Sequence, residues 1–147
     1  MTSEKGTDAS GVRLPTATDQ KHRPNKRLHL SLESERSGLA VVLHCQSRTI
    51  FRQEARELSA VVSDVLPTSR RMIVDLAGVD SVDQGGLGEL VLTQLWAEAS
   101  GYTLTFASPK KSVRRLFEIT NVALVFDVYP SVADAMLAMA PLMADPS

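Results

Sequence analysis

The stretch that decides the fold runs from Met72 to Trp96 and reads MIVDLAGVDSVDQGGLGELVLTQLW. Its apolar start predicts a buried strand over 72–76, and the acidic segment after it predicts a turn that leads into glycines 85, 86 and 88. From Glu89 onward the apolar residues recur at helical spacing, which predicts a helix to about Ser100. In an open α/β sheet, partners bind where strands end, so we expect the functional site at this turn.

The length and composition of the chain limit its number of domains and the kinds of partner to expect. The chain has 147 residues, of which 44% are hydrophobic, enough for one packed domain. A net charge of -1 gives no reason to expect nucleic acid or an anionic membrane as the main partner. The single cysteine, Cys45, lies in an apolar run and is expected to be a buried thiol. Without a hydrophobic signal core or an apolar run of about 20 residues, the chain is expected to be cytoplasmic.

Polar, low-complexity sequence marks both ends of the chain. Residues 1–27 are rich in Ser, Thr, Lys, Asp, Gly and Pro without any apolar period, and we expect a disordered tail there. Residues 142–147 are expected to be a disordered C-terminal end. A single domain is therefore predicted over residues 28–141.

Strands and helices alternate along this domain. Alternating leucines over 28–33 and the apolar run 39–45 predict a hairpin that turns at Ser37-Gly38. Helices are predicted over 52–66, ended by Pro67, over 110–120 with a basic outer face, and from Ser131 as N-cap. Further strands are predicted over 102–107 and 122–129. The fold class is therefore α/β: a mixed, mostly parallel sheet with an N-terminal antiparallel hairpin and about four helices.

Three separated segments resemble a known family. They are 74–88 (VDLAGVDSVDQGGLG), 108–120 (SPKKSVRRLFEIT) and 125–129 (VFDVY). In order and spacing they are similar to the STAS domain, the module of anti-sigma factor antagonists and of sulfate transporter tails. The resemblance covers about Leu28 to Ala140 and implies the fold predicted above.

The loop before Gly86-Leu87-Gly88 departs from the family pattern. The resemblance implies an aspartate, matched by Asp83, followed by hydroxyl residues, the second of which accepts phosphate from a kinase that is also an anti-sigma factor. Here Gln84 and Gly85 occupy those positions, and glycine carries no oxygen to phosphorylate. A phosphate beside Asp83 would repel a partner, so its loss removes that switch. Ser81 is the nearest hydroxyl but is expected at a strand end that faces packing.

A second departure lies at Ile50-Phe51, where many family members have a more polar rim that includes an aspartate. An exposed apolar pair at this place is a candidate partner contact. The same pair would also suit packing of the following helix onto the sheet. Both interpretations stay open at the level of sequence.

Catalysis finds no support in the sequence. The aspartates 75, 80 and 83 have no neighbouring His or metal-ligand spacing and are typical of turns and helix caps. The histidines 22, 29 and 44 are scattered, and the glycines lack the pattern of a P-loop. We therefore expect no enzyme, no metal and no cofactor.

The sequence as a whole predicts a regulator similar to anti-sigma factor antagonists, of the kind that controls bacterial transcription by binding proteins. The expected partner is an anti-sigma factor with serine kinase activity or another signalling protein; a homodimer stays open, and nucleic acid and membrane are not expected. The predicted partner-binding residues are Asp83, Gln84, Gly85, Gly86, Leu87, Gly88, Ile50 and Phe51. The alternative is a sensor that binds a nucleotide or small ligand at the same helix N-terminus.

Overall fold

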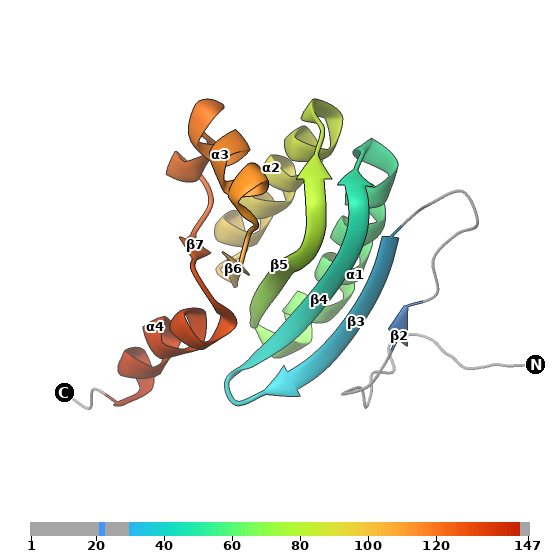
Figure 1. The fold of residues 1–147 in the computed structure, drawn as a ribbon. Helices are drawn as coiled ribbons and strands as arrows, with labels where there is room; N and C mark the ends of the chain where they lie inside the picture. The colour runs from blue at the N-terminus through green and yellow to red at the C-terminus, as the bar shows by residue number, and fades with distance from the viewer. Residues whose placement is uncertain (1–20, 23–29, 145–147) are drawn as a thin grey trace, which may run out of the picture.

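A computed structural model describes residues 21–22 and 30–144 of the chain. Within them, six strands form one sheet in the order β2-β3-β4-β5-β6-β7 (Figure 1). The strands are β2 (Lys21–His22), β3 (Leu30–Ser37), β4 (Ala40–Ile50), β5 (Arg71–Val82), β6 (Thr103–Ala107) and β7 (Val128–Tyr129). The helices are α1 (Arg52–Ser69), α2 (Gln84–Ala99), α3 (Lys111–Ile119), the 3-10 turn η1 (Val122–Leu124) and α4 (Val132–Ala144).

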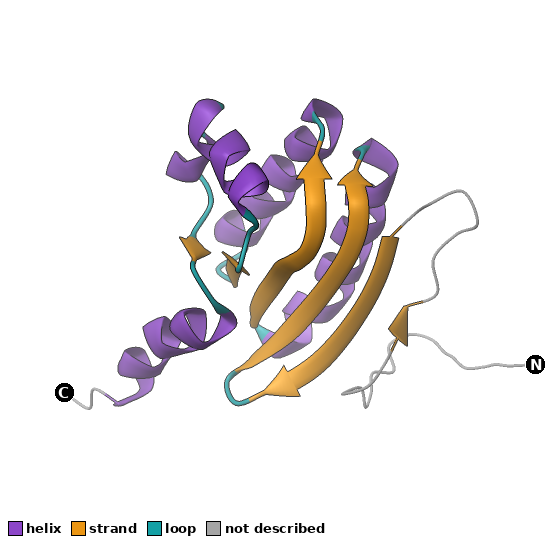
Figure 2. Cartoon of the chain, viewed as in Figure 1, coloured by secondary structure: helices purple, strands orange, loops and turns teal. Residues whose placement is uncertain are grey.

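The pairing of the strands is mixed. β2, β3 and β4 are antiparallel, whereas β4, β5, β6 and β7 run parallel to one another. Each parallel crossover contains a helix, so the strands β4, β5 and β6 end at the same edge and each is followed there by a helix (Figure 2). This edge therefore gathers the N-termini of α1, α2 and α3.

The two faces of the sheet are covered differently. The main core lies on the face that carries α1 and α2, and it includes alternate residues of β4 such as Leu43 and Cys45. On the other face α4 covers only part of the sheet, where Ala135 and Met139 pack on Val42 and Ile73. The remainder of that face is left to polar side chains of β3, β4 and β5.

The fold class predicted from the sequence is confirmed, including the antiparallel hairpin, which turns at Gly38 with φ of +59°. The stop of α2 before Gly101 and the cap of α4 are confirmed as well, since the amide of Asp134 donates to Ser131 Oγ over 3.0 Å.

Several predicted boundaries were wrong. The segment 75–82 is strand and not a turn, because it continues to pair with β4 as far as Val82. α1 passes through Pro67 and ends at Ser69, where Arg70 takes a left-handed φ of +69° and its amide donates to the carbonyl of Leu66. The last strand is shorter than predicted: Val122–Leu124 form η1 and only Val128–Tyr129 pair with β6.

The ends of the domain also differ from the predicted ranges. Lys21–His22, within the predicted tail, pair with β3 as strand β2. The terminal helix α4 runs to Ala144 and so enters the predicted C-terminal end. The rest of the predicted tail and residues 145–147 lie outside the described residues.

Candidate functional site

The glycine-rich segment after β5 is the start of α2, and the predicted glycine turn was wrong. The helix begins at Gln84, directly after Asp83. Asp83 is its N-cap residue and stabilises the first helical turn, so the glycines continue as helix. Its carboxylate Oδ1 accepts a hydrogen bond from the amide of Gly86 over 2.8 Å. The amide of Asp83 donates to the carbonyl of Ile50 over 3.1 Å, which ties the cap to the end of β4. Asp83 is thus an N-cap, as expected for a helix-start aspartate.

Gly86 is required by the packing of α2 against β4. A Cβ atom at this position would lie 2.1 Å from the carbonyl oxygen of Ile50, a distance that no side chain tolerates. The absent side chain therefore lets the helix start touch the end of the neighbouring strand. Gly86 acts in the fold and is itself buried.

Gly85, in contrast, is not required by packing. A Cβ atom there would lie 3.5 Å from Arg52 Cβ and 3.6 Å from Asp83 Oδ1, which are ordinary contact distances. Its backbone φ is not in the left-handed region, and the residue is partly exposed. The fold would accept serine or alanine at this position, so the lack of a hydroxyl is not imposed by structure.

The predicted site residues divide into accessible and buried groups. Phe51 is 51% exposed, and Gln84 and Gly88 are exposed as well, with Asp83 and Gly85 partly so. Gly86, Leu87 and Ile50 are buried, and Ile50 is fully covered by the main core. Ile50, which was named as a partner-binding residue, is fully buried because β4 continues to this residue and turns its side chain inward. Of the two interpretations left open for the pair, packing therefore holds for Ile50, and Phe51 is the exposed member. We call Phe51, Asp83, Gln84, Gly85 and Gly88 the α2 rim.

The neighbouring helix α3 is fastened to the same edge of the sheet. Lys110 Nζ lies 2.5 Å from Asp80 Oδ1, and Ser112 Oγ donates to the Asp80 carbonyl over 2.9 Å. The hydrogen bond and the charge of Lys110 hold the pKa of the Asp80 carboxyl below its usual value. The Asp80 segment of β5 therefore anchors α3 close to the α2 rim.

The hydroxyl of Ser81 is engaged within the sheet. It lies 2.8 Å from Thr49 Oγ1 and donates to the Arg48 carbonyl over 3.2 Å. Both partners belong to β4, so the side chain ties the ends of two strands together. This placement suits the prediction of a packing role for Ser81.

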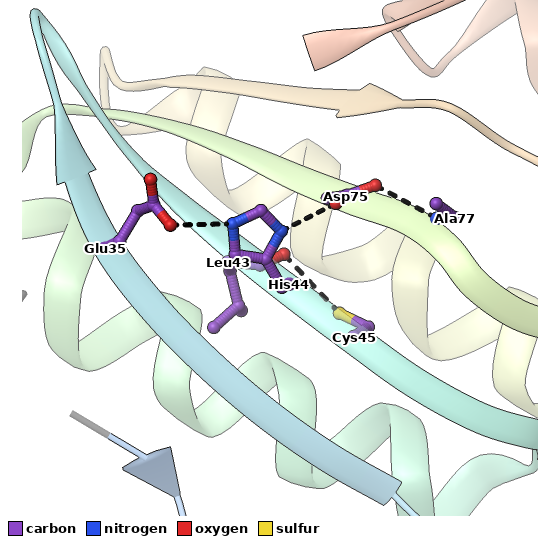
Figure 3. A network of polar contacts seen from close by, with 6 residues as sticks. All are labelled: Glu35, Leu43, His44, Cys45, Asp75 and Ala77. Atoms are coloured by element: carbon purple, nitrogen blue, oxygen red, sulfur yellow. Dashed lines mark hydrogen bonds and ion pairs between the residues drawn. The ribbon is translucent and has the colours of Figure 1, made fainter. Parts of the chain in front are cut away.

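A polar network on the open face of the sheet was missed by sequence reasoning. Figure 3 shows His44 of β4 between Asp75 of β5 and Glu35 of β3. His44 Nδ1 lies 2.6 Å from Asp75 Oδ2, and Nε2 lies 3.1 Å from Glu35 Oε1. The other oxygen of Asp75 accepts from the amide of Ala77 over 3.0 Å. His44 and Asp75 are 31 positions apart, so their spacing in the sequence does not indicate a contact. The parallel register of β4 and β5, which pairs these two residues, is the signal that could have revealed it.

The network favours a charged imidazole. Burial lowers the pKa of His44, but the hydrogen bonds and charges of Asp75 and Glu35 outweigh it, and the pKa is raised above its usual value. The physical reason is that both ring nitrogens face carboxylates, and only the imidazolium donates at both. The network therefore joins three strands by charge.

The cysteine beside His44 does not take part in the network. Cys45, the next residue, is buried on the opposite face, and burial raises the pKa of its thiol. Among residues 21–22 and 30–144, no three His, Cys, Asp or Glu side chains gather in a way that could hold a metal ion. None of the helices in that part of the chain is long and apolar enough to cross a membrane.

The sequence model of the STAS domain matches residues 31–135. The chain belongs to the STAS domain family. The match begins one residue inside β3, includes β4 to β7 and the helices α1, α2 and α3, and ends within α4. It therefore includes the α2 rim and α3.

Solved structures show the same fold at low sequence identity. An anti-sigma factor antagonist from Mycobacterium paratuberculosis is 20% identical, with a TM-score of 0.65 over 76% of this chain and 94% of that chain. A sulfate transporter family protein from Wolinella succinogenes is 15% identical, with a TM-score of 0.64 over 74% and 91%. The anti-sigma factor antagonist SpoIIAA in its unphosphorylated form is 16% identical, with a TM-score of 0.57 over 75% and 96%.

Proposed function

We propose that this STAS domain is a non-catalytic signalling protein, similar to anti-sigma factor antagonists, that binds a protein partner through the α2 rim. The proposed partner is an anti-sigma factor with serine kinase activity or another protein of the same signalling complex. Because such a kinase uses ATP, the proposal places the chain in the cytoplasm.

The observation that carries this proposal is the shape of the α2 rim. Phe51 offers an exposed aromatic ring, and the helix start beside it exposes Gln84 and the two glycines Gly85 and Gly88, the first of these glycines only in part. Aromatic residues are enriched where proteins bind one another, and small residues let a partner backbone come close. The rim thus suits recognition of a protein surface.

We further propose that phosphorylation does not switch this rim at position 85. Gly85 has room for a side chain but carries no hydroxyl. The nearest hydroxyl in the strand, Ser81, bonds to β4. Binding would then be constitutive, or controlled through the partner.

The alternative sensor function gains no support from the geometry. The carboxylate of Asp83 already caps the amide of Gly86 at the start of α2. A phosphate group at this place would face that negative charge. Calorimetry with ATP and GTP tests the alternative, and heat of binding at micromolar nucleotide that disappears in Gly85→Glu would favour it.

Partner binding is tested by calorimetry with each kinase-type anti-sigma factor of the source organism. Gly85→Glu places a charged side chain on the rim and is expected to weaken binding at least about tenfold, which corresponds to about 1.4 kcal/mol. Gly85→Ala is the matched control, because the structure has room for its methyl group. Equal affinity of natural chain and Gly85→Glu would move the interface elsewhere.

A further inference from the structure

The helix beside the α2 rim carries an uneven charge. The segment Lys110–Ile119 holds four of the 16 Lys and Arg residues of the chain and only one of its 17 Asp and Glu residues, Glu118. All four cationic side chains are exposed, namely Lys110, Lys111, Arg114 and Arg115. In a chain with a net charge of -1, this makes α3 a local positive surface.

Most of this charge is not neutralised within the described residues. Lys110 pairs with Asp80 at 2.5 Å, which uses its charge to fasten the helix. Lys111, Arg114 and Arg115 make no ion pair with any described residue. Their charges are therefore available to an outside partner, and their orientation is fixed by the buried residues Val113 and Phe117 on the opposite side of α3.

Two strongly exposed apolar residues follow the basic face. Leu124 is 88% exposed and Ile119 is 67% exposed, the highest values among the large hydrophobic residues that the structure describes. Leu124 lies on η1, whose next residues return to the core: Phe126 is buried and packs on Phe117 with ring centroids 5.2 Å apart. Leu124 is thus held outward on an anchored turn, which lowers the entropy cost of binding.

We infer that α3 and η1 form a docking surface for an acidic segment of the protein partner, one that also carries an apolar side chain. We call Lys111, Arg114, Arg115, Ile119 and Leu124 the α3 surface. Carboxylates of the partner pair with the three free cations, and its apolar residue covers Leu124 and Ile119. The inference rests on the proposed function, because it assigns to the partner at the α2 rim a second contact on the adjacent helix.

The chemistry of the α3 surface favours a protein over other polyanions. Nucleic acid would meet the cations but leave Leu124 and Ile119 against phosphates and water. A membrane would require a wider apolar face, and that of α3 is already buried in the core through Val113 and Phe117. An acidic protein segment matches both the charge and the apolar contact.

The test uses a synthetic helical peptide with glutamates on one side and leucines at every fourth position, titrated into the whole isotope-labelled chain. Amide NMR shifts are expected at Arg114, Arg115 and Leu124, and weaker binding at higher salt. Arg115→Glu and Leu124→Ser are each expected to lower the affinity about fivefold. Arg36→Glu, an exposed cation on β3, is the matched control and is expected to leave it unchanged.

Duplex DNA and vesicles of phosphatidylcholine with phosphatidylserine serve as competing probes. Absence of peptide binding, shifts confined to other elements, or stronger binding of DNA or vesicles than of the peptide would each overturn the inference. Its failure is separable from failure of the proposed function. Partner binding that is lost in Gly85→Glu but unchanged in Arg115→Glu would support the α2 rim and contradict the α3 surface. Partner binding that is lost in Arg115→Glu but unchanged in Gly85→Glu would support the α3 surface and contradict the α2 rim.

Discussion

The first turns of α2 and α3 begin at the same edge of the sheet, yet different forces hold them. α2 carries no charge in its first turn and is fixed by shape: Gly86 fits under the Ile50 carbonyl and Asp83 caps the backbone. The start of α3 has no side-chain cap hydrogen bond; an ion pair from Lys110 and a hydrogen bond from Ser112 hold it to Asp80. The buried side chains Val113 and Phe117 orient the rest of the helix. The start of α2 therefore tolerates little change where it touches β4, whereas the exposed residues of α3 can vary without disturbing the core.

The largest effect is expected at Gly86. Gly86→Ala places a methyl group 2.1 Å from the Ile50 carbonyl, and we expect it to lower the free energy of unfolding by about 3 kcal/mol. Gly85→Ala is the paired variant and is expected to be neutral or to stabilise by up to about 0.5 kcal/mol, since alanine favours the helix. Urea denaturation of both variants measures the difference. Equal destabilisation by the two would contradict the steric distinction between these neighbours.

A smaller effect is expected from removing the cap of α2. Asp83→Ala leaves the amide of Gly86 without its acceptor and is expected to cost about 1 kcal/mol of stability. Asp83→Asn retains an oxygen at the cap and is expected to recover most of the loss. Chemical denaturation checks both variants, and a stable Asp83→Ala protein would show that packing alone fixes the helix start.

A pH-dependent effect is expected from the His44 network, a second place where charge joins neighbouring elements. The pKa of His44 is raised in the folded chain, so its contribution to stability is complete below the unfolded pKa of about 6.5 and is lost as pH rises through the higher folded pKa. We expect the natural chain to lose more stability than His44→Gln between about pH 6 and pH 9. Thermal melting across this range measures it, with the other two histidines common to both proteins. Parallel pH profiles of the two proteins would show that the His44 network does not contribute to stability.

The smallest effect is expected at the anchor of α3. Asp80→Asn removes the charge that faces Lys110, but the pair is exposed, so its effect on the unfolding midpoint should be less than that of Asp83→Ala. Because the pKa of Asp80 is lowered, its contribution is present above the unfolded value of about 3.8 and is lost as pH falls through the folded value. Added salt should abolish the difference between Asp80→Asn and the natural chain. A difference that persists in high salt would indicate that shape, not charge, holds α3.

The fold was predictable because periodicity reports which face of each element is buried. The alternating leucines of β3, the apolar start of β5 and the stripes of α1 and α3 all placed their elements correctly. The start of α2 was not predictable in this way. Three glycines suggest a turn by local preference, and only the tertiary contact of Gly86 with β4 explains why they lie in a helix.

The candidate site was predictable in place but not in detail. Asp83 and Gly85 were located by resemblance, whereas the burial of Ile50 depended on how far β4 extends. The His44 network joins residues distant in sequence, and the roles of Asp75 and Asp80 emerged only with their partners, whereas the cap at Asp83 was expected. Sequence reasoning therefore named this edge of the sheet as the candidate site, while packing decided which of its residues are exposed.

Phosphorylation of two matched proteins tests whether the start of α2 lacks the phosphorylation switch. The natural chain and Gly85→Ser, whose side chain the structure accommodates, are each incubated with labelled ATP and a kinase-type anti-sigma factor that binds them. We expect no label in residues 81–88 of the natural chain and label at position 85 of Gly85→Ser. Label within residues 81–88 of the natural chain would contradict this expectation.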